Sequence, residues 1–320
     1  MSIVVQKPGI QTTVQDLGRF RYQKMGINPS GVMDPVAARL VNILLGNRDD
    51  EAVLEMHYPA SHFHFGADAI CAIGGADFAP SIDGIAVDNW RAFSVPKDSI
   101  LTFGAKRAGS RTYLAVAGGF DIEDWLGSAS TNLAAKEGGF YGRMLRAGDE
   151  IGLGLVSESN LPVSPGKISR SLIPSYSSHP VVRVIAGAEF DCINNKGRKT
   201  FLKNDFSISA DSNRMGFRLV GEQIALSAPL ELLSSAVSVG TIQLLPDGQL
   251  IVLMADHQTT GGYARIAHVI SYDLPLVAQL GTNDKITFQL VDIMEAEDLA
   301  IQFEKNLSFL RAACRFQTNS

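Results

Sequence analysis

The chain has 320 residues, of which 46% are hydrophobic and 19% charged, with a formal net charge of −5 and a sequence pI near 5.7. This composition is that of an ordinary globular protein with a packed core, and the length allows two domains. Because the lysines and arginines are scattered along the sequence, we expect no surface for the phosphate backbone of a nucleic acid.

Neither a secretion signal nor a membrane span is recognisable, so we expect a cytoplasmic protein. Residues Met1 to Pro8 lack the charged and apolar segments of a signal peptide, and no stretch has the eighteen or so apolar residues of a span. Cysteines occur far apart and without a CxxC spacing, which indicates free thiols; they are Cys71, Cys192 and Cys314.

Short β-branched runs and frequent glycine predict a mainly-β chain, built as barrels or sandwiches, with three helices. The first helix runs from its N-cap Asp34 to Gly46. A short second helix is predicted at Leu274–Gln279, with Asp273 as a possible cap. The last is predicted at Glu295–Ala312, where apolar residues recur at helical spacing.

The two halves of the chain resemble each other weakly, which indicates an internal duplication of one β domain. A strand-like run followed by Gly118-Gly119 in the first half corresponds to the run Leu250–Ala255 followed by Gly261-Gly262 in the second. Residues 156–180 are rich in Ser and Pro and are predicted as the linker, which places the domains at residues 1–165 and 166–320.

The segment that follows the apolar run 250–254 is the strongest candidate for a functional site. It combines an acid, an imidazole, an amide, two hydroxyls and two glycines, namely Asp256, His257, Gln258, Thr259, Thr260, Gly261 and Gly262, before Tyr263. Converging donors and acceptors of this kind can polarise an amide or carboxyl group, and glycines let backbone N–H groups approach it. The alternative is a polar turn whose side chains bind their own backbone.

Two further polar segments lie near the N-terminus. Asp16 and Arg19, which follow Gln15, could form a local ion pair or contact an anionic substrate. The residues from Asn28 to Asp34 lead into the first helix, whose free N–H groups favour a carboxylate or phosphate oxygen. Asp34 itself is explained most simply as the helix cap.

Other motifs give weaker signals. A turn at Asn213-Arg214 presents a guanidinium that could hold a carboxylate or simply lie in solvent. His62 and His64 would share one face of a strand, but no third ligand is fixed by spacing, so we expect no metal site. The chain has no GxGxxG and no GxxxxGK[ST] motif, so it should not bind ATP through a phosphate loop of its own.

Four of these segments together resemble the family of the 5-oxoprolinase C subunit, also described as allophanate hydrolase subunit 2 or biotin-dependent carboxyltransferase-like, and related to the carboxyltransferase part of urea carboxylase. The matching residues are Pro8 to Arg19, Ser30 to Asp34, Asn213 to Gly216 and Asp256 to Tyr263. The resemblance implies two cyclophilin-like β-barrel domains with a few peripheral helices. It also implies a complex with a B subunit of the allophanate hydrolase subunit 1 type and an A subunit of the LamB/YcsF type. That complex opens 5-oxoproline (pyroglutamate) to L-glutamate with consumption of ATP.

The chain departs from the family pattern at two places. Ser235-Ala236 stands where many relatives have Glu-Gly, so that a carboxylate is lost, and Ala264 stands where relatives usually have proline. The substrate could therefore differ, or a partner could supply the missing group.

Within this hypothesis the catalytic residues are those of the second-half loop. Asp256 or His257 would transfer a proton, and the polarising donors would be Gln258, Thr259, Thr260 and backbone N–H groups near Gly261. Arg214 or Arg19 would hold a carboxylate. The substrate-binding set is Gln15, Asp16, Arg19, Ser30, Asp34, Asn213, Arg214, Gly261, Gly262 and Tyr263.

Two other functions stay open. One is carboxyl transfer to urea or a related amide, which needs biotin on a separate carrier because this chain has no biotin-carrying lysine segment. The other is regulation, in which the protein sequesters a kinase-inhibitor partner. In the leading hypothesis ATP is a cofactor of the complex.

Overall fold

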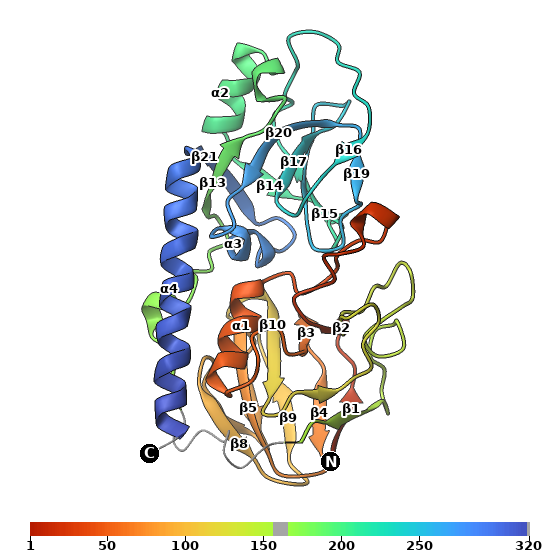
Figure 1. Ribbon diagram of the computed structural model, residues 1–320, viewed down its shortest axis with the longest axis vertical. Helices are drawn as coiled ribbons and strands as arrows, with labels where there is room; N and C mark the ends of the chain where they lie inside the picture. Colours follow the sequence, from red (N-terminus) through yellow and green to blue (C-terminus); the bar gives the residue numbers. More distant parts are fainter. Residues whose placement is uncertain (156–165, 319–320) are drawn as a thin grey trace. The chain divides into compact units, whose positions relative to one another are not determined.

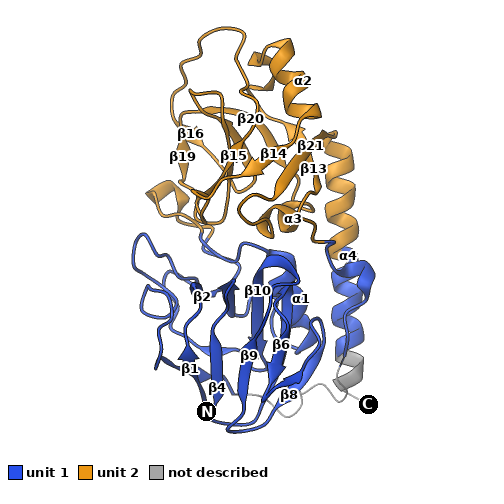
Figure 2. Ribbon diagram, turned by 180° about the vertical axis from the view of Figure 1, so that it is seen from behind, with its two compact units in different colours: residues 1–19, 30–175, 305–320 blue, residues 20–29, 176–304 orange. Residues whose placement is uncertain are grey.

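The computed structural model describes residues 1–155 and 166–318 and is built mainly from β-strands (Figure 1), which confirms the predicted fold class. The chain divides into two compact units (Figure 2): unit 1 comprises residues 1–19, 30–175 and 305–320, and unit 2 comprises residues 20–29 and 176–304. The main division falls at 175/176 rather than at 165/166. It still lies in the predicted linker, of which residues 156–165 are outside the described part of the chain.

Unit 1 contains two β-sheets that share one apolar core. Their strand orders are β11-β12-β1-β4-β9-β6-β7 and β2-β3-β10-β5-β8. In β4 (His62–Phe65) both phenylalanines are fully buried and both histidines are half-buried on the opposite face, as the alternation predicted. The other strands are β1 Ser2–Lys7, β2 Gln11–Gln15, β3 Val53–His57, β5 Ala69–Asp77, β6 Pro80–Ile82, β7 Ile85–Ala86, β8 Ala92–Val95, β9 Ile100–Phe103, β10 Ala108–Val116, β11 Phe120–Asp121 and β12 Glu150–Leu153.

Helix α1 (Pro35–Leu44) packs on β5 and β10 of unit 1. It begins where predicted, since the Asp34 carboxylate accepts a hydrogen bond from the Ala37 N–H at 2.9 Å. Gly74 allows this packing, because a Cβ atom there would lie 2.7 Å from the side chains of both Val41 and Trp90. This glycine therefore has a packing role.

Unit 2 is a closed barrel with the strand order β13-β20-β17-β18-β15-β14-β21. Only the β13–β21 pair is parallel among the described pairs of this barrel. A separate two-stranded ladder joins β16 to β19. The strands are β13 Val181–Ala186, β14 Phe206–Ile208, β15 Gly216–Val220, β16 Ser235–Ala236, β17 Thr241–Leu244, β18 Leu250–Leu253, β19 Thr260–Gly261, β20 Ala264–Val269 and β21 Lys285–Leu290.

The helices of the C-terminal half confirm two predictions and add one element. The predicted short helix is α3 (Leu274–Ala278), but the side chain of Asp273 does not cap it and instead binds Arg183 at 2.6 and 2.9 Å. The predicted last helix is α4, which is longer at both ends (Ile293–Thr318). Helix α2 (Asn195–Lys203) was not predicted.

Short 3-10 turns complete the described elements: η1 Gln23–Met25, η3 Arg170–Leu172 and η4 Phe190–Cys192. None of the helices in the described ranges is long and apolar enough to cross a membrane.

Candidate functional site

The polar loop of the second half connects two strands that both pair with β17. It leaves β18, pairs with β16 through Thr260 and Gly261, and re-enters the barrel at β20. Its path brings it over the strand that lies between β18 and β20. Its partners in the β16–β19 ladder are Ser235 and Ala236.

Arg214 and Asp256 form a buried ion pair at the start of this loop. The Nε and Nη2 atoms of Arg214 lie 2.8 and 3.1 Å from the two carboxylate oxygens, and the side chains are 5% and 11% exposed. The backbone adds a third link, because the Asp256 N–H donates to the Arg214 carbonyl at 2.8 Å. In this geometry each group is engaged by the other, and the predicted roles of Arg214 as a carboxylate-binding group and of Asp256 as a proton-transfer group stay predictions. The neighbouring Asn213 is exposed, and its side chain accepts from the Met215 N–H.

His257 is 3% exposed, and its Nδ1 atom lies 2.6 Å from the carbonyl oxygen of Gln258. A carbonyl oxygen can only accept, so Nδ1 carries the hydrogen and Nε2 keeps its lone pair. Burial lowers the pKa of His257 below its ordinary value of 6.5, which outweighs the opposite effects of the Gln258 carbonyl and the Asp256 charge. The imidazole is therefore neutral at pH 7 and has an acceptor nitrogen, as a general base requires.

The next residues of the loop pack around the side-chain amide of Gln243 on β17, which is fully buried. Gln258 donates from Nε2 to Oε1 of Gln243 at 3.4 Å. Gly261 lies against the same side chain, because a Cβ atom on it would be 2.5 Å from Gln243 Nε2. Thr259 accepts a backbone hydrogen bond from Val237 at 3.2 Å.

Beyond Gly261 the loop becomes exposed and borders a cavity of about 580 Å³. Gly262, Tyr263 and Ala264 form one part of its wall, and residues 223–230, Leu232 and the turn 244–248 form the rest. Tyr263 is 46% exposed, while Ala264 is buried as the first residue of β20.

A segment from near the N-terminus also contacts this loop within unit 2. Residues 20–29 belong to unit 2, and the Asn28 side chain donates to the Asp256 carbonyl at 3.0 Å. Asn28 is the first residue of the loop predicted to lead into the first helix, but its contact with Asp256 was not predicted.

In unit 1 the predicted residues Asp16 and Gln15 hold a buried polar segment in place. The Asp16 carboxylate accepts from the hydroxyls of Ser128 and Ser130 and from two backbone N–H groups. Gln15 donates to the Thr131 carbonyl at 3.2 Å. The run of small polar residues at 128–132 is the sequence signal that could have identified this cluster.

Arg19 is almost fully buried in unit 1. Its guanidinium lies 4.6 Å from the ring centroid of Trp125 and donates to the Ser130 carbonyl. Position 138, which lies beside this contact, requires glycine, because a Cβ atom on Gly138 would lie 2.3 Å from the carbonyl oxygen of Ser130. Arg19 therefore has a structural role in unit 1, which differs from the predicted contact with a ligand.

Two backbone N–H groups just before helix α1 are bound by groups of the chain itself. The Met33 N–H donates to Glu55 at 2.7 Å, and the Asp34 N–H donates to the Tyr113 hydroxyl at 2.9 Å. An anion site at the start of this helix stays a prediction. The missed partners, Glu55 and Tyr113, are bonded to each other at 2.8 Å, and burial raises the pKa of Tyr113 far above its ordinary value. Ser30 has a buried hydroxyl without a hydrogen-bond partner.

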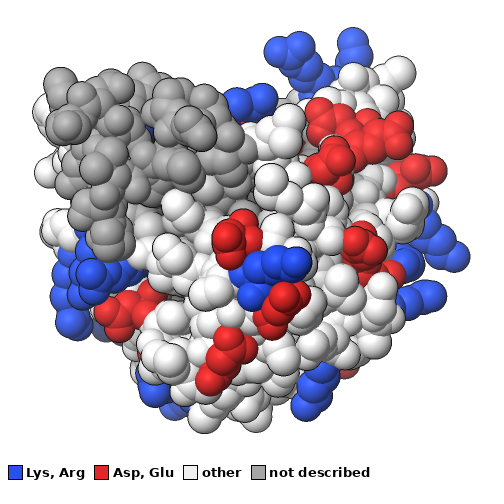
Figure 3. Space-filling model, turned by 90° about the horizontal axis from the view of Figure 1, so that it is seen from below, with Lys and Arg blue, Asp and Glu red and all other residues white. Residues whose placement is uncertain are grey.

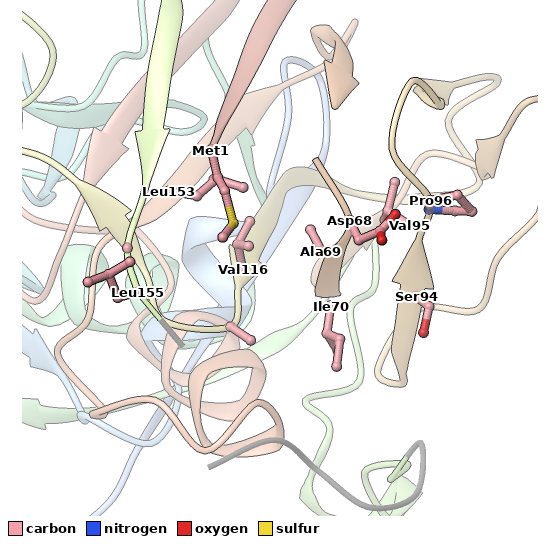
Figure 4. Close-up of a pocket in the computed structure, with 12 residues that line it drawn as sticks. Met1, Asp68, Ala69, Ile70, Ser94, Val95, Pro96, Val116, Leu153 and Leu155 are labelled. Atoms are coloured by element: carbon pink, nitrogen blue, oxygen red, sulfur yellow. The ribbon is translucent and has the colours of Figure 1, made fainter. Parts of the chain in front are cut away.

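A cavity of about 570 Å³ in unit 1 contains none of the predicted residues (Figure 4). Its wall is apolar apart from Asp68 and Ser94, and the remaining lining residues are Met1, Ala69, Ile70, Val95, Pro96, Val116, Ala117, Leu153, Gly154 and Leu155. On the face shown in Figure 3, basic side chains are interspersed with acidic ones over a larger uncharged area. Within residues 1–155 and 166–318 no three His, Cys, Asp or Glu side chains lie together as a metal-binding group.

Comparison with known proteins identifies the family of this chain. The family model "Carboxyltransferase domain, subdomain A and B" matches residues 25–290, and the chain belongs to this family. It is 35% identical over 301 residues to the 5-oxoprolinase C subunit of Haemophilus influenzae, a match that covers 94% of this chain and 95% of the relative. It is 34% identical over 292 residues to the 5-oxoprolinase C subunit of Escherichia coli, covering 91% of each chain.

The fold of this chain is also similar to that of a solved structure. The crystal structure of Kluyveromyces lactis urea amidolyase matches 97% of this chain with a TM-score of 0.90 and 27% identity. This chain spans 20% of the length of that chain.

Proposed function

We propose that this chain is the C subunit of an ATP-dependent 5-oxoprolinase, which opens 5-oxoproline to L-glutamate together with B-type and A-type subunits. The observation that carries the proposal is the 35% identity to a 5-oxoprolinase C subunit over nearly the whole of both chains. The polar loop supports it, because the reaction must break an amide bond and the loop offers amide and hydroxyl donors beside an imidazole acceptor.

In this proposal His257 accepts a proton through Nε2, since its neutral imidazole is fixed by the contact of Nδ1 with the Gln258 carbonyl. Gln258, Thr259 and Thr260 act as donors to the lactam carbonyl oxygen. Arg214 and Asp256 hold the start of the loop. No residue of this chain is assigned to ATP, which would supply the driving force for ring opening when bound by the complex.

Reconstitution tests this proposal. The purified chain is mixed with its B-type and A-type partners, and glutamate release from 5-oxoproline is followed with and without ATP. We expect release that requires ATP and stops when this chain is left out. Full activity of the two partners alone would contradict the proposal.

The structural match to urea amidolyase favours one second candidate, carboxyl transfer to urea or a related amide with biotin on a separate carrier. The test is transfer of label to urea by the chain from a biotin carrier that has been carboxylated beforehand with labelled bicarbonate, which leaves the carrier with free biotin. Incorporation above a carrier-only control would support this candidate, and a signal equal to that control would exclude it.

A further inference from the structure

We propose that the side-chain amide of Gln243 is a ligand-binding group, which donates a hydrogen bond to the carbonyl oxygen of a small amide bound at the 256–263 loop. This inference rests on the proposed function and names a residue that the sequence motifs did not include. It starts from the position of Gln243 on β17.

Gln243 points away from the barrel core and yet is inaccessible to solvent. Its neighbours along the strand, Ile242 and Leu244, are apolar core residues, so the side chain between them faces outward. It is nevertheless 0% exposed. The loop covers it, with the Gly261 backbone placed so that a Cβ atom would lie 2.5 Å from Nε2.

The side-chain oxygen of Gln243 has a hydrogen-bond partner, and the side-chain nitrogen has none. Oε1 accepts from Gln258 at 3.4 Å, whereas Nε2 is buried without a hydrogen-bond partner. Buried donors without an acceptor are costly and therefore few in native proteins, and those present mark a bound water or a functional group. A ligand oxygen that reached Nε2 would satisfy this donor.

The surroundings of Nε2 favour a neutral oxygen. The residue opposite Gln243 on β20 is Arg265, whose guanidinium is held by Glu189 at 2.8 and 3.1 Å, so its charge is compensated. An uncharged amide donor beside a compensated ion pair suits the carbonyl of an amide, such as the lactam of 5-oxoproline or urea, better than a carboxylate.

The loop permits access from its exposed side. Gly261 is held by the two-residue β16–β19 ladder, and the next residue, Gly262, is exposed. Neither glycine has a side chain that would lie between the exposed surface at Gly262 and Nε2 of Gln243.

Two substitutions of Gln243 test the inference in the assembled complex. Gln243→Glu keeps the acceptor for Gln258 and the volume of the side chain, and Gln243→Met keeps the volume alone; both remove the N–H donor. We expect each to raise KM for 5-oxoproline about tenfold, with a smaller change in kcat. Gln289→Glu, the same change at an exposed position of β21, is the control and should leave KM unchanged. If either Gln243 variant keeps the wild-type KM, the inference is wrong and the proposed function stands.

A direct readout separates the inference from the proposed function. The side-chain amide signal of Gln243 in the ¹⁵N-labelled full chain is assigned by its loss in both variants, and 5-oxoproline or urea is added. A shift of this signal with either compound supports the inference even if the complex has no 5-oxoprolinase activity. An unmoved signal with both compounds, as expected for a bound water only, overturns it.

Discussion

The side chains of the 256–263 loop differ in how much of their hydrogen-bonding capacity the fold itself uses. Asp256 is engaged by Arg214 through both oxygens. His257 uses Nδ1 and keeps Nε2 as an acceptor. The chemistry that remains for a ligand is therefore concentrated on His257 and on the amides beside it.

Removing one partner of the buried ion pair should destabilise the protein strongly, because the other charge stays buried. For Asp256→Asn we expect the free energy of unfolding to fall by about 3 kcal/mol, as measured by denaturant unfolding. Asp211→Asn, at an exposed position in the turn that precedes Arg214, is the control and should change it little. An Asp256 variant as stable as the control would show that the pair is not held as the structure describes.

The lowered pKa of His257 predicts how the stability of the folded protein changes at acidic pH. Burial lowers this pKa in the folded state below 6.5, so the unfolded chain binds the proton more readily. The contribution of His257 to stability is present above pH 6.5 and is lost as the pH falls through the folded pKa. The wild-type protein should therefore lose more thermal stability between pH 7 and pH 5 than His257→Asn, and equal losses would contradict the assignment.

At the scale of elements, local signals predicted the helices whose ends are marked by particular residues. Asp34 and Pro35 identified α1, and the apolar spacing identified α4. Helix α2 was missed because it is short, polar and contains Gly197, although Asn194 caps it through the Gly197 N–H at 2.7 Å. A cap alone is a weak signal when the following residues do not favour a helix.

The candidate site was predictable only in part, because strand pairing is not local. The loop 256–263 could be identified from its composition, but Gln243 lies under it through the pairing of β17 with β18 and β20. Glu55 on β3 likewise binds the backbone N–H of Met33, just before α1, although the two residues lie 22 positions apart in the sequence. A polar residue inside an otherwise apolar strand is the sequence signal that both share, and it does not say which loop the residue meets.

The C-terminal part of α4 is held in unit 1 by an ion pair. Arg311 donates to the Asp49 carboxylate, which also accepts from Arg39. Burial raises the pKa of Asp49, but the hydrogen bonds from the two arginines outweigh it, so that the net pKa is lowered. Because these side chains are partly exposed, Arg311→Ala should cost less than about 1 kcal/mol of global stability. It should speed hydrogen exchange in residues 305–314, whereas Lys305→Ala should not; unchanged exchange in both would contradict this role.

At the scale of the whole molecule, each unit has its own set of buried polar groups. Asp16, Arg19 and Gln15 form one set in unit 1, and the 256–263 loop with Arg214 and Gln243 forms the other in unit 2. The match to the 5-oxoprolinase C subunit of Haemophilus influenzae extends over 94% of this chain, so both units belong to the shared family.

The most direct test that the amide bond is broken at the 256–263 loop is the kcat/KM for 5-oxoproline of the reconstituted complex with His257→Asn in place of the wild-type chain. Asparagine can keep a donor near the position of Nδ1 and removes the Nε2 acceptor. Size-exclusion chromatography establishes that the variant still assembles with its partners, and Gln289→Glu serves as the active control. We expect a loss of kcat/KM of about a hundredfold in an intact complex. Wild-type turnover by that intact complex would show that the loop is not where the amide bond is broken.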